Sequence, residues 1–229
     1  MQRFFDILFS ALALLVLSPL LVSVVILLRL TGEGEVFFFQ DRVGQGGRPF
    51  KLYKFVTMLK NSPAMGMGTV TVKNDPRILP VGSFLRKTKI NELPQLLNIL
   101  NGDMSVIGPR PQTQRCFDAF TPIAQAAVIQ VRPGLSGIGS ILFRDEEEML
   151  DGLQDPAHFY DHVVMPYKGS LEEWYINNNN LWTYFMLIAL TVWVMLFPKS
   201  KAVWRIFSSL PKPSPELVRV FGGTNDEKP

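Results

Sequence analysis

A run of 22 uncharged residues from Ile7 to Leu28 constrains this chain more than any other feature. Asp6 precedes the run and Arg29 follows it. As a straight helix at ~1.5 Å per residue, the run would be about 33 Å long, close to the thickness of a bilayer's hydrocarbon core. It is too long for the apolar part of a signal peptide, and no small-residue cleavage site follows it. The sequence therefore predicts a segment in contact with a membrane.

Ser18 and Pro19 lie near the middle of this run. A proline there frees the carbonyl of Leu15 and predicts a kink. The Ser18 hydroxyl can bond to a carbonyl one turn back, which lowers the cost of the break in lipid. A sharp bend gives arms of about 15 to 18 Å, each too short to cross, so the chain would return to the face it entered. From these residues alone, a spanning helix and a re-entrant hairpin are equally favoured.

The composition limits the rest of the chain to one ordinary domain with a small appendage. The chain has 229 residues, of which 47% are hydrophobic, so neither a large multidomain protein nor a disordered chain fits. Through Arg144 there are 16 basic and 8 acidic residues, and from Asp145 onward there are 7 and 12. The basic half is expected to face an anion, and nucleic acid, phosphorylated metabolites and acidic lipids all qualify.

Two short apolar runs predict a pair of strands in the body of the protein. Residues 36–39 and 50–55 are such runs, and a glycine-rich turn at 44–47 separates them. Further on, residues 181–197 form a second uncharged stretch with tryptophans near its ends. Seventeen residues are at the lower limit for spanning, so this stretch is predicted to be a helix at the membrane interface or packed on the body.

A cluster of cations directly precedes a predicted helix start. Leucines within residues 93–100 have the spacing of a helix with one buried face, and the helix is expected to end near Gly102. Asn91 is the candidate N-cap, with Pro94 in the first turn. A helix start beside cations can also bind phosphate through free N–H groups and the helix dipole. The cations are Arg77, Arg86, Lys87 and Lys89.

Two further arginines stand beside residues that restrict or redirect the backbone. Arg110 lies between Pro109 and Pro111, and Arg132 precedes Pro133 and Gly134. Stiffly presented guanidinium groups suit bidentate contacts with phosphate oxygens. Either element alone is more typical of an ordinary turn than of a phosphate site.

Taken together, these motifs resemble the bacterial sugar transferase family, the monotopic polyprenyl-phosphate phosphoglycosyl transferases that begin surface-glycan assembly. The resemblance covers about residues 3–197 and rests on ordered motifs. They are Arg3-Phe4-Phe5-Asp6, Leu17-Ser18-Pro19-Leu20, Gln40-Asp41-Arg42-Val43-Gly44, Tyr53-Lys54-Phe55, Asp75-Pro76-Arg77, Phe84-Leu85-Arg86-Lys87-Thr88, Glu92-Leu93-Pro94-Gln95, Gly102-Asp103-Met104-Ser105, Gly108-Pro109-Arg110-Pro111 and Arg132-Pro133-Gly134.

The resemblance implies an activity and a place in the cell. Family members move a sugar-1-phosphate from a nucleotide diphosphosugar, usually a UDP-sugar, to undecaprenyl phosphate, release the nucleoside monophosphate and require magnesium. Their membrane segment is a re-entrant helical hairpin broken at the position of Ser18-Pro19, on the cytoplasmic face of the bacterial inner membrane. The implied fold is α/β (α+β), monotopic, with a small sheet, helices and a carboxy-terminal interfacial helix. The expected division is 1–32 for the membrane helix, 33–198 for the catalytic domain and 199–229 for the tail.

The chain departs from the family pattern at Asn91, where the family has an aspartate that attacks the β-phosphate and forms a phosphosugar-enzyme intermediate. A carboxamide has no anionic oxygen for this attack. Three explanations stay open: a deliberate knock-out, a natural variant in which Glu92 or direct attack by the lipid phosphate replaces the covalent step, or an inactive relative. Val56 also stands where the family usually has arginine, so one phosphate contact is expected to be missing.

The resemblance and the physical logic of phosphoryl transfer give a predicted site. Asn91 and Glu92 are the candidate catalytic positions, and Glu92 is the first candidate ligand for Mg²⁺, with Asn91 second. The expected partners are the nucleotide sugar, undecaprenyl phosphate and membrane lipids, and the oligomeric state is left open. A non-catalytic membrane-associated protein that binds the same ligands is the alternative, whereas a nucleic-acid-binding module lacks a recognised motif. The predicted phosphate contacts are Lys54, Arg77, Arg86, Arg110, Arg132 and Gln40.

Overall fold

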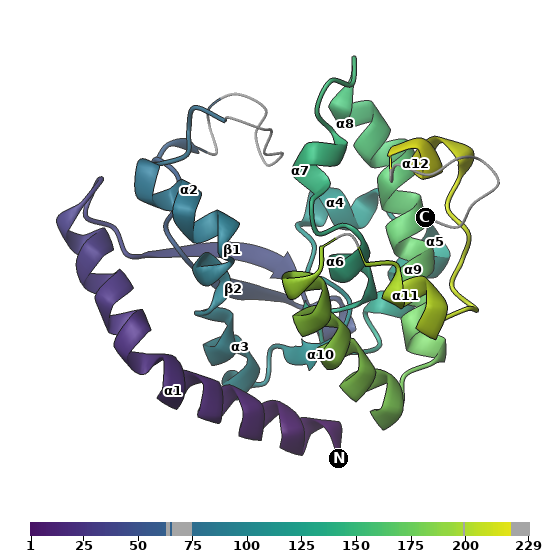
Figure 1. Ribbon diagram of the computed structural model, residues 1–229, viewed down its shortest axis with the longest axis horizontal. Coiled ribbons are helices and arrows are strands. Elements are labelled where there is room, and N and C mark those ends of the chain that lie inside the picture. The colour runs from purple at the N-terminus through teal and green to yellow at the C-terminus, as the bar shows by residue number, and fades with distance from the viewer. Residues whose placement is uncertain (63–64, 66–74, 199, 221–229) are drawn as a thin grey trace.

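The computed structural model describes residues 1–62, 65, 75–198 and 200–220. Figure 1 shows a central hairpin of β1 and β2 with α2 and α3 on one side and a larger group of helices around α9 and α10 on the other. The predicted mixture of helices with small sheets is confirmed. The described strands are β1 (Phe37–Val43), β2 (Pro49–Phe55), β3 (Ser105–Ile107) and β4 (Gly134–Ser136). The described helices are α1 (Gln2–Leu30), α2 (Pro80–Lys87), α3 (Gln95–Asn101), α4 (Gln114–Asp118), α5 (Pro122–Val128), α6 (Ile138–Leu142), α7 (Glu146–Met149), α8 (Pro156–Phe159), α9 (Met165–Asn177), α10 (Leu181–Leu196), α11 (Ala202–Ile206) and α12 (Pro215–Val220), with helical turns at Gln45–Gly47, Ile90–Glu92 and Tyr160–Val164.

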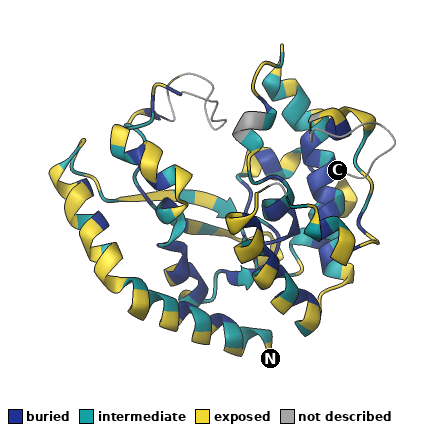
Figure 2. Cartoon of the chain, in the orientation of Figure 1, coloured by how far each residue is buried: buried dark blue, intermediate teal, exposed yellow. Residues whose placement is uncertain are grey.

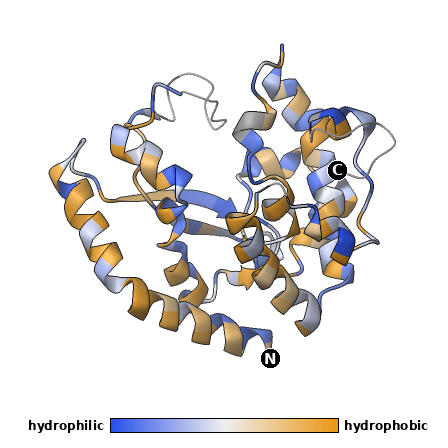
Figure 3. Ribbon diagram, in the orientation of Figure 1, coloured by the Kyte–Doolittle hydropathy of each residue, from blue (hydrophilic) through white to orange (hydrophobic). Residues whose placement is uncertain are grey.

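Helix α1 is continuous through Ser18 and Pro19, and it bends instead of folding back into two separate arms. The Ser18 hydroxyl donates to the carbonyl of Leu15 at 2.8 Å, as the sequence predicted. Pro19 removes one backbone donor, and this hydroxyl supplies another, so the helix can continue past the proline. By length and composition α1 could cross a bilayer, and its apolar outer side is exposed along most of its length (Figures 2 and 3).

The amino-terminal turns of α1 are tied to the body by polar contacts. The buried carboxylate of Asp6 accepts hydrogen bonds from the hydroxyls of Ser105 and Tyr184 and from the N–H of Val106, each at 2.9 Å. Arg3 donates to the carbonyls of Ile99 and Leu100 near the end of α3. Because buried polar groups must be satisfied, these contacts fix the direction in which α1 leaves the body.

Apolar side chains of α1 also belong to the cores of the body. Val24 and Leu28 are buried against Phe55 and Leu85, and the middle of the helix packs on the cluster that joins β2 to α3. Phe5 packs edge-on against Phe185 of α10, with ring centroids 4.9 Å apart. Helix α1 and the body therefore share one continuous packing arrangement.

The hairpin of β1 and β2 matches the strands predicted from the sequence. The strands are antiparallel, with Gln40 opposite Leu52 and Arg42 opposite Phe50. The turn contains Gly46 and Gly47 at φ 69° and 72°, a conformation that suits glycine. Side chains on β1 and β2 therefore alternate between two faces, one of which lies toward α3 and the loop after β3.

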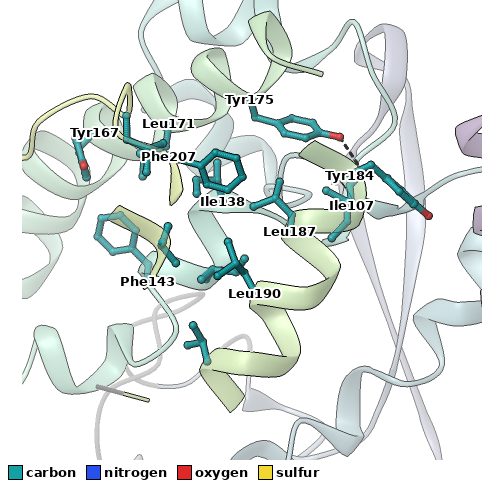
Figure 4. Packing of buried hydrophobic residues seen from close by; sticks show 14 of the residues in the cluster. Ile107, Ile138, Phe143, Tyr167, Leu171, Tyr175, Tyr184, Leu187, Leu190 and Phe207 are labelled. Carbon is teal, nitrogen blue, oxygen red and sulfur yellow. Dashed lines mark hydrogen bonds between the residues drawn. The ribbon is translucent and has the colours of Figure 1, made fainter. Parts of the chain in front are cut away.

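The larger group of helices encloses the main core, shown in Figure 4. The short parallel strands β3 and β4 lie at its edge, and α9 and α10 supply Leu171, Tyr175, Tyr184 and Leu187, all at 1% exposure or less. Residues of the segment expected as a tail also enter this core. They include Val203, Phe207, Leu210 and Leu217, and the hydroxyl of Tyr167 donates to the carbonyl of Pro211.

Candidate active site

One face of the hairpin presents a group of polar and cationic side chains. Lys54 on β2 lies diagonally across from Gln40 on β1, and Arg42 follows two residues on. Because residues two apart on a strand share a face, these three side chains lie on the same side of the hairpin. Arg42 Nη2 donates to Gln40 Oε1 at 2.6 Å, and Arg42 Nη1 donates to the carbonyl of Pro111 at 3.0 Å.

The turn Ile90–Glu92 brings the predicted catalytic positions to this face. It begins after Lys89, a non-glycine residue with φ 59°, which reverses the chain sharply after α2. Asn91 is buried, and its Oδ1 has no hydrogen-bond partner within the described part of the chain. The expectation that Asn91 caps the next helix is therefore wrong: α3 begins at Gln95, after a helical Leu93-Pro94 step without a side-chain cap.

Glu92 and Arg110 form an ion pair at the centre of the site, with Arg110 Nη2 3.0 Å from Glu92 Oε1. The Glu92 side chain is 16% exposed and that of Arg110 38% exposed. Burial opposes ionisation of Glu92, but the charges of Arg110 and Lys54 and the hydrogen bond from Arg110 prevail and lower its pKa to about 2. Glu92 in turn raises the pKa of Arg110 above its ordinary value, against the effect of burial. Both groups are therefore charged at neutral pH.

The cations around the hairpin lower one another's pKa values. Burial lowers the pKa of Lys54 to about 7; Glu92 opposes this shift, while Arg42, Arg110 and Arg86 add to it. Burial, together with the charge of Arg110, lowers the pKa of Arg42 to about 10. Cations that disfavour one another in this way bind an anion with more than one negative charge well, because the anion relieves their mutual repulsion.

The structure brings together part of the predicted phosphate-binding set. Lys54, Glu92 and Arg110 interact directly or through their charges, and Arg86, in the last turn of α2, is close enough to affect Lys54. Gln40 joins this group through Arg42.

Two predicted arginines take part in other contacts. Arg77 is buried against Asp75, with Nη2 2.6 Å from Oδ2, and Arg77 Nη1 donates to the carbonyls of Ser62 and Met65. Arg132 Nε donates to the carbonyl of Gly102 at 2.8 Å, at the carboxyl end of α3. Their roles as phosphate contacts remain predictions.

Two residues that sequence reasoning did not single out belong to this site. The sequence did contain a signal for Arg42: it follows Gln40 by two residues in a predicted strand, so the two side chains are expected on the same face. No signal in the sequence pointed to Glu172 on α9, which is 2% exposed and whose Oε2 has no partner in the described part of the chain. It lies close enough to Arg110 for the backbone and the charge of Arg110 to act on its pKa. Burial raises the pKa of Glu172 to about 8. A Cβ at Gly139 would collide with Glu172 Oε1, so a glycine there leaves room for the carboxyl group.

The donor set at the turn fits a magnesium ion that shares its coordination with a substrate. Among the described residues there is no group of three histidine, cysteine, aspartate or glutamate side chains that could hold a metal by themselves. Mg²⁺, however, usually takes one or two protein oxygens and completes its shell with water and phosphate. The unpartnered Oδ1 of Asn91 and the neighbouring carboxylate of Glu92 supply two such oxygens.

A long apolar helix with an exposed outer side, joined to a body that gathers cations and a carboxylate, is typical of the class of membrane-associated enzymes that act on phosphorylated substrates. This chain belongs to the bacterial sugar transferase family: the family model with that description matches residues 1–198. The chain is 34% identical over 198 residues to the UDP-N-acetylgalactosamine-undecaprenyl-phosphate N-acetylgalactosaminephosphotransferase of Aeromonas hydrophila, covering 85% of this chain and 43% of that protein.

Other relatives extend the same comparison. The chain is 32% identical over 197 residues to the UDP-glucose:undecaprenyl-phosphate glucose-1-phosphate transferase of Escherichia coli K12, covering 84% of this chain and 39% of that protein. It is 38% identical over 172 residues to the exopolysaccharide production protein ExoY of Sinorhizobium fredii, covering 69% of this chain and 76% of that protein. The chain thus spans less than half the length of the first two relatives.

Proposed function

We propose that this protein transfers a sugar-1-phosphate from a nucleotide diphosphosugar, a UDP-sugar in particular, to undecaprenyl phosphate. The products are an undecaprenyl diphosphate sugar and UMP, and the reaction begins the assembly of a glycan at the membrane. The observation that carries this proposal is the meeting of Glu92, Arg110 and Lys54 beside the unpartnered amide oxygen of Asn91. The names of the relatives from Aeromonas hydrophila and Escherichia coli support the choice of substrates.

The cations of the site have a direct role in the proposed reaction. A phosphate oxygen of the lipid attacks the β-phosphorus of the donor, and the bond from that phosphorus to the bridging oxygen breaks. UMP leaves with the bridging oxygen and its electron pair. Lys54 and Arg110 bind phosphate oxygens and stabilise the charge that grows on the leaving group, which is the main requirement of phosphoryl transfer.

Glu92 and Asn91 are the proposed protein ligands for Mg²⁺. When bound, the ion supplies further neutralisation of phosphate charge. Arg110 pairs with Glu92 in the structure, so substrate binding would let Arg110 turn to a phosphate while Glu92 takes up its ligand role. This exchange of partners keeps both charges compensated before and after the substrate enters.

Replacing Asn91 tests whether the reaction passes through a covalent intermediate at this position or through direct attack by the lipid phosphate. The assay measures UMP released from a panel of UDP-sugars with undecaprenyl phosphate and magnesium in detergent micelles. If the chain has lost a nucleophile, Asn91→Asp raises turnover by orders of magnitude. An active Asn91 protein that the change leaves unaffected supports direct attack by the lipid phosphate. Absence of UMP release from both forms, with UDP-sugar binding retained, would replace this proposal by the non-catalytic binding protein that Asn91 also favours.

The membrane arrangement is part of the proposal. We propose that α1 is a re-entrant segment in a monotopic protein on the cytoplasmic face of the inner membrane. The bend of α1 (Figure 1), its exposed apolar side and the polar anchoring of its first turns support the re-entrant arrangement. The test labels an amino-terminal tag and a cysteine introduced by Lys51→Cys in sealed inverted vesicles. Both sites should react from the same side, whereas labelling from opposite sides would establish a spanning helix.

The apolar face of α10 is the proposed second contact with the membrane. Trp182 and Trp193 on this helix are 56% and 46% exposed, and residues near its carboxyl end are equally open. Aromatic side chains of this kind favour the headgroup layer. We propose the division into a membrane segment at 1–32, a catalytic region at 33–198 and a tail at 199–229, of which Val203, Phe207, Leu210 and Leu217 pack in the core of the catalytic region.

A further inference from the structure

Strand β1 carries three consecutive phenylalanines, and only one of them lies on the face of the candidate site. Phe37 stacks on Phe55 and Phe39 meets Tyr53 edge-on, so these two rings lie on the other face of the hairpin. Phe38 is paired across the strands with Lys54. Directly opposite side chains lie on the same face with their Cβ atoms about 4.5–5.5 Å apart, so the ring of Phe38 begins beside the Lys54 side chain.

The ring of Phe38 is open to a ligand. Phe38 is 37% exposed, and within the described part of the chain it belongs to no buried cluster and to no ring pair. The next residues on the same face, Gln40 and Arg42, are occupied by each other and by the carbonyl of Pro111. The open end of this face therefore combines an aromatic ring with the cations proposed above to bind phosphate.

A nucleotide has both features that such a surface recognises, because it joins a planar base to phosphates. An aromatic side chain stacks on a base through the π-face that every base has, while cations hold the phosphates. We propose that Phe38 stacks on the base of a nucleotide whose phosphates lie at Lys54 and Arg110. This assignment rests on the proposed function, and it names the element of the site that recognises the nucleoside half of the donor.

The test compares two ligands that differ in the base. Calorimetry measures the binding of UMP and of inorganic pyrophosphate to the full chain in detergent, at a fixed magnesium concentration. Phe38→Ala should weaken UMP binding about tenfold, equivalent to ~1.4 kcal/mol, and leave pyrophosphate binding unchanged. Phe38→Tyr should bind UMP like the parent protein. Phe39→Ala is the matched control: its ring is adjacent and more exposed, at 54%, but on the other face, so binding of both ligands should be unchanged.

Several results would overturn the proposal, and they separate it from the proposed function. Unchanged UMP binding by Phe38→Ala, with pyrophosphate still bound, overturns the stacking alone. An equal loss of both ligands means that Phe38 supports the fold of the site instead of the base. A loss of binding to phosphatidylethanolamine–phosphatidylglycerol vesicles, with UMP binding unchanged, makes Phe38 a membrane contact. Failure of the parent protein to bind pyrophosphate removes the phosphate site and the stacking together.

Discussion

The pKa of Lys54 leads to a pH dependence of anion binding that can be worked out from the structure. Burial lowers this pKa to about 7 in the free protein. By the ordinary titration relation, Lys54 is about 90% protonated at pH 6 and about 10% protonated at pH 8. If only the charged form binds phosphate, the apparent dissociation constant varies inversely with that fraction. The affinity for pyrophosphate should therefore fall about tenfold between pH 6 and pH 8.

The Lys54→Arg variant isolates this effect, because a guanidinium stays charged over the whole range. Both proteins are titrated with pyrophosphate by calorimetry in magnesium-free buffer, and the ratio of their affinities cancels the titration of the ligand itself. The ratio should change about tenfold across the range. Lys51→Arg, an exposed position on the other face of β2, should behave like the parent protein. Identical pH profiles for the parent protein and Lys54→Arg would refute the reasoning.

The remaining predictions concern stability and are measured by urea unfolding. Arg77→Leu leaves the buried carboxylate of Asp75 uncompensated and should lower the free energy of unfolding by about 3 kcal/mol. A loss below ~1 kcal/mol is typical of an exposed ion pair and would contradict this expectation. Asp6→Ala removes the acceptor of three hydrogen bonds and should cost on the order of 3 kcal/mol, and an unchanged midpoint would contradict this role. The pKa of Glu172 is raised to about 8, so the native state binds more protons than the unfolded chain between about pH 4.5 and pH 8. Stability should fall with rising pH across that window, and Glu172→Gln should lack this component; equal slopes would argue against a buried carboxyl group.

Local pattern was sufficient to predict the hairpin and the helix that follows Asn91 and Glu92, but not the separate turn at Ile90–Glu92. Apolar runs separated by glycines have few alternatives to a pair of strands, and leucines at helical spacing after Pro94 require a helix near the one observed. The same pattern gave the hydrogen bond from Ser18 to Leu15, because both residues lie within one turn of Pro19. Interactions within a turn or between the two strands of a hairpin depend on residues that are close together in the sequence.

The contact partners of the arginines could not be predicted from local sequence. Arg110 meets Glu92 across 18 residues, and Arg132 meets the carbonyl of Gly102 across 30, so nothing local distinguishes the first from the second. Glu172 is still farther along the sequence from Glu92, and its place beside the site depends on how α9 packs against the loop that carries Arg110. An arginine next to a proline signals a stiff backbone, but which group it contacts is decided by tertiary packing.

The shared packing of α1 and the body has a practical consequence for work on this protein. Deleting residues 1–30 to obtain a water-soluble fragment would remove Val24 and Leu28 from their contacts with Phe55 and Leu85. It would also leave the hydroxyls of Tyr184 and Ser105 without the carboxylate of Asp6, which accepts their hydrogen bonds. The truncated polypeptide would expose fresh apolar surface next to the hairpin of β1 and β2, so purification has to begin from the intact chain in detergent or nanodiscs.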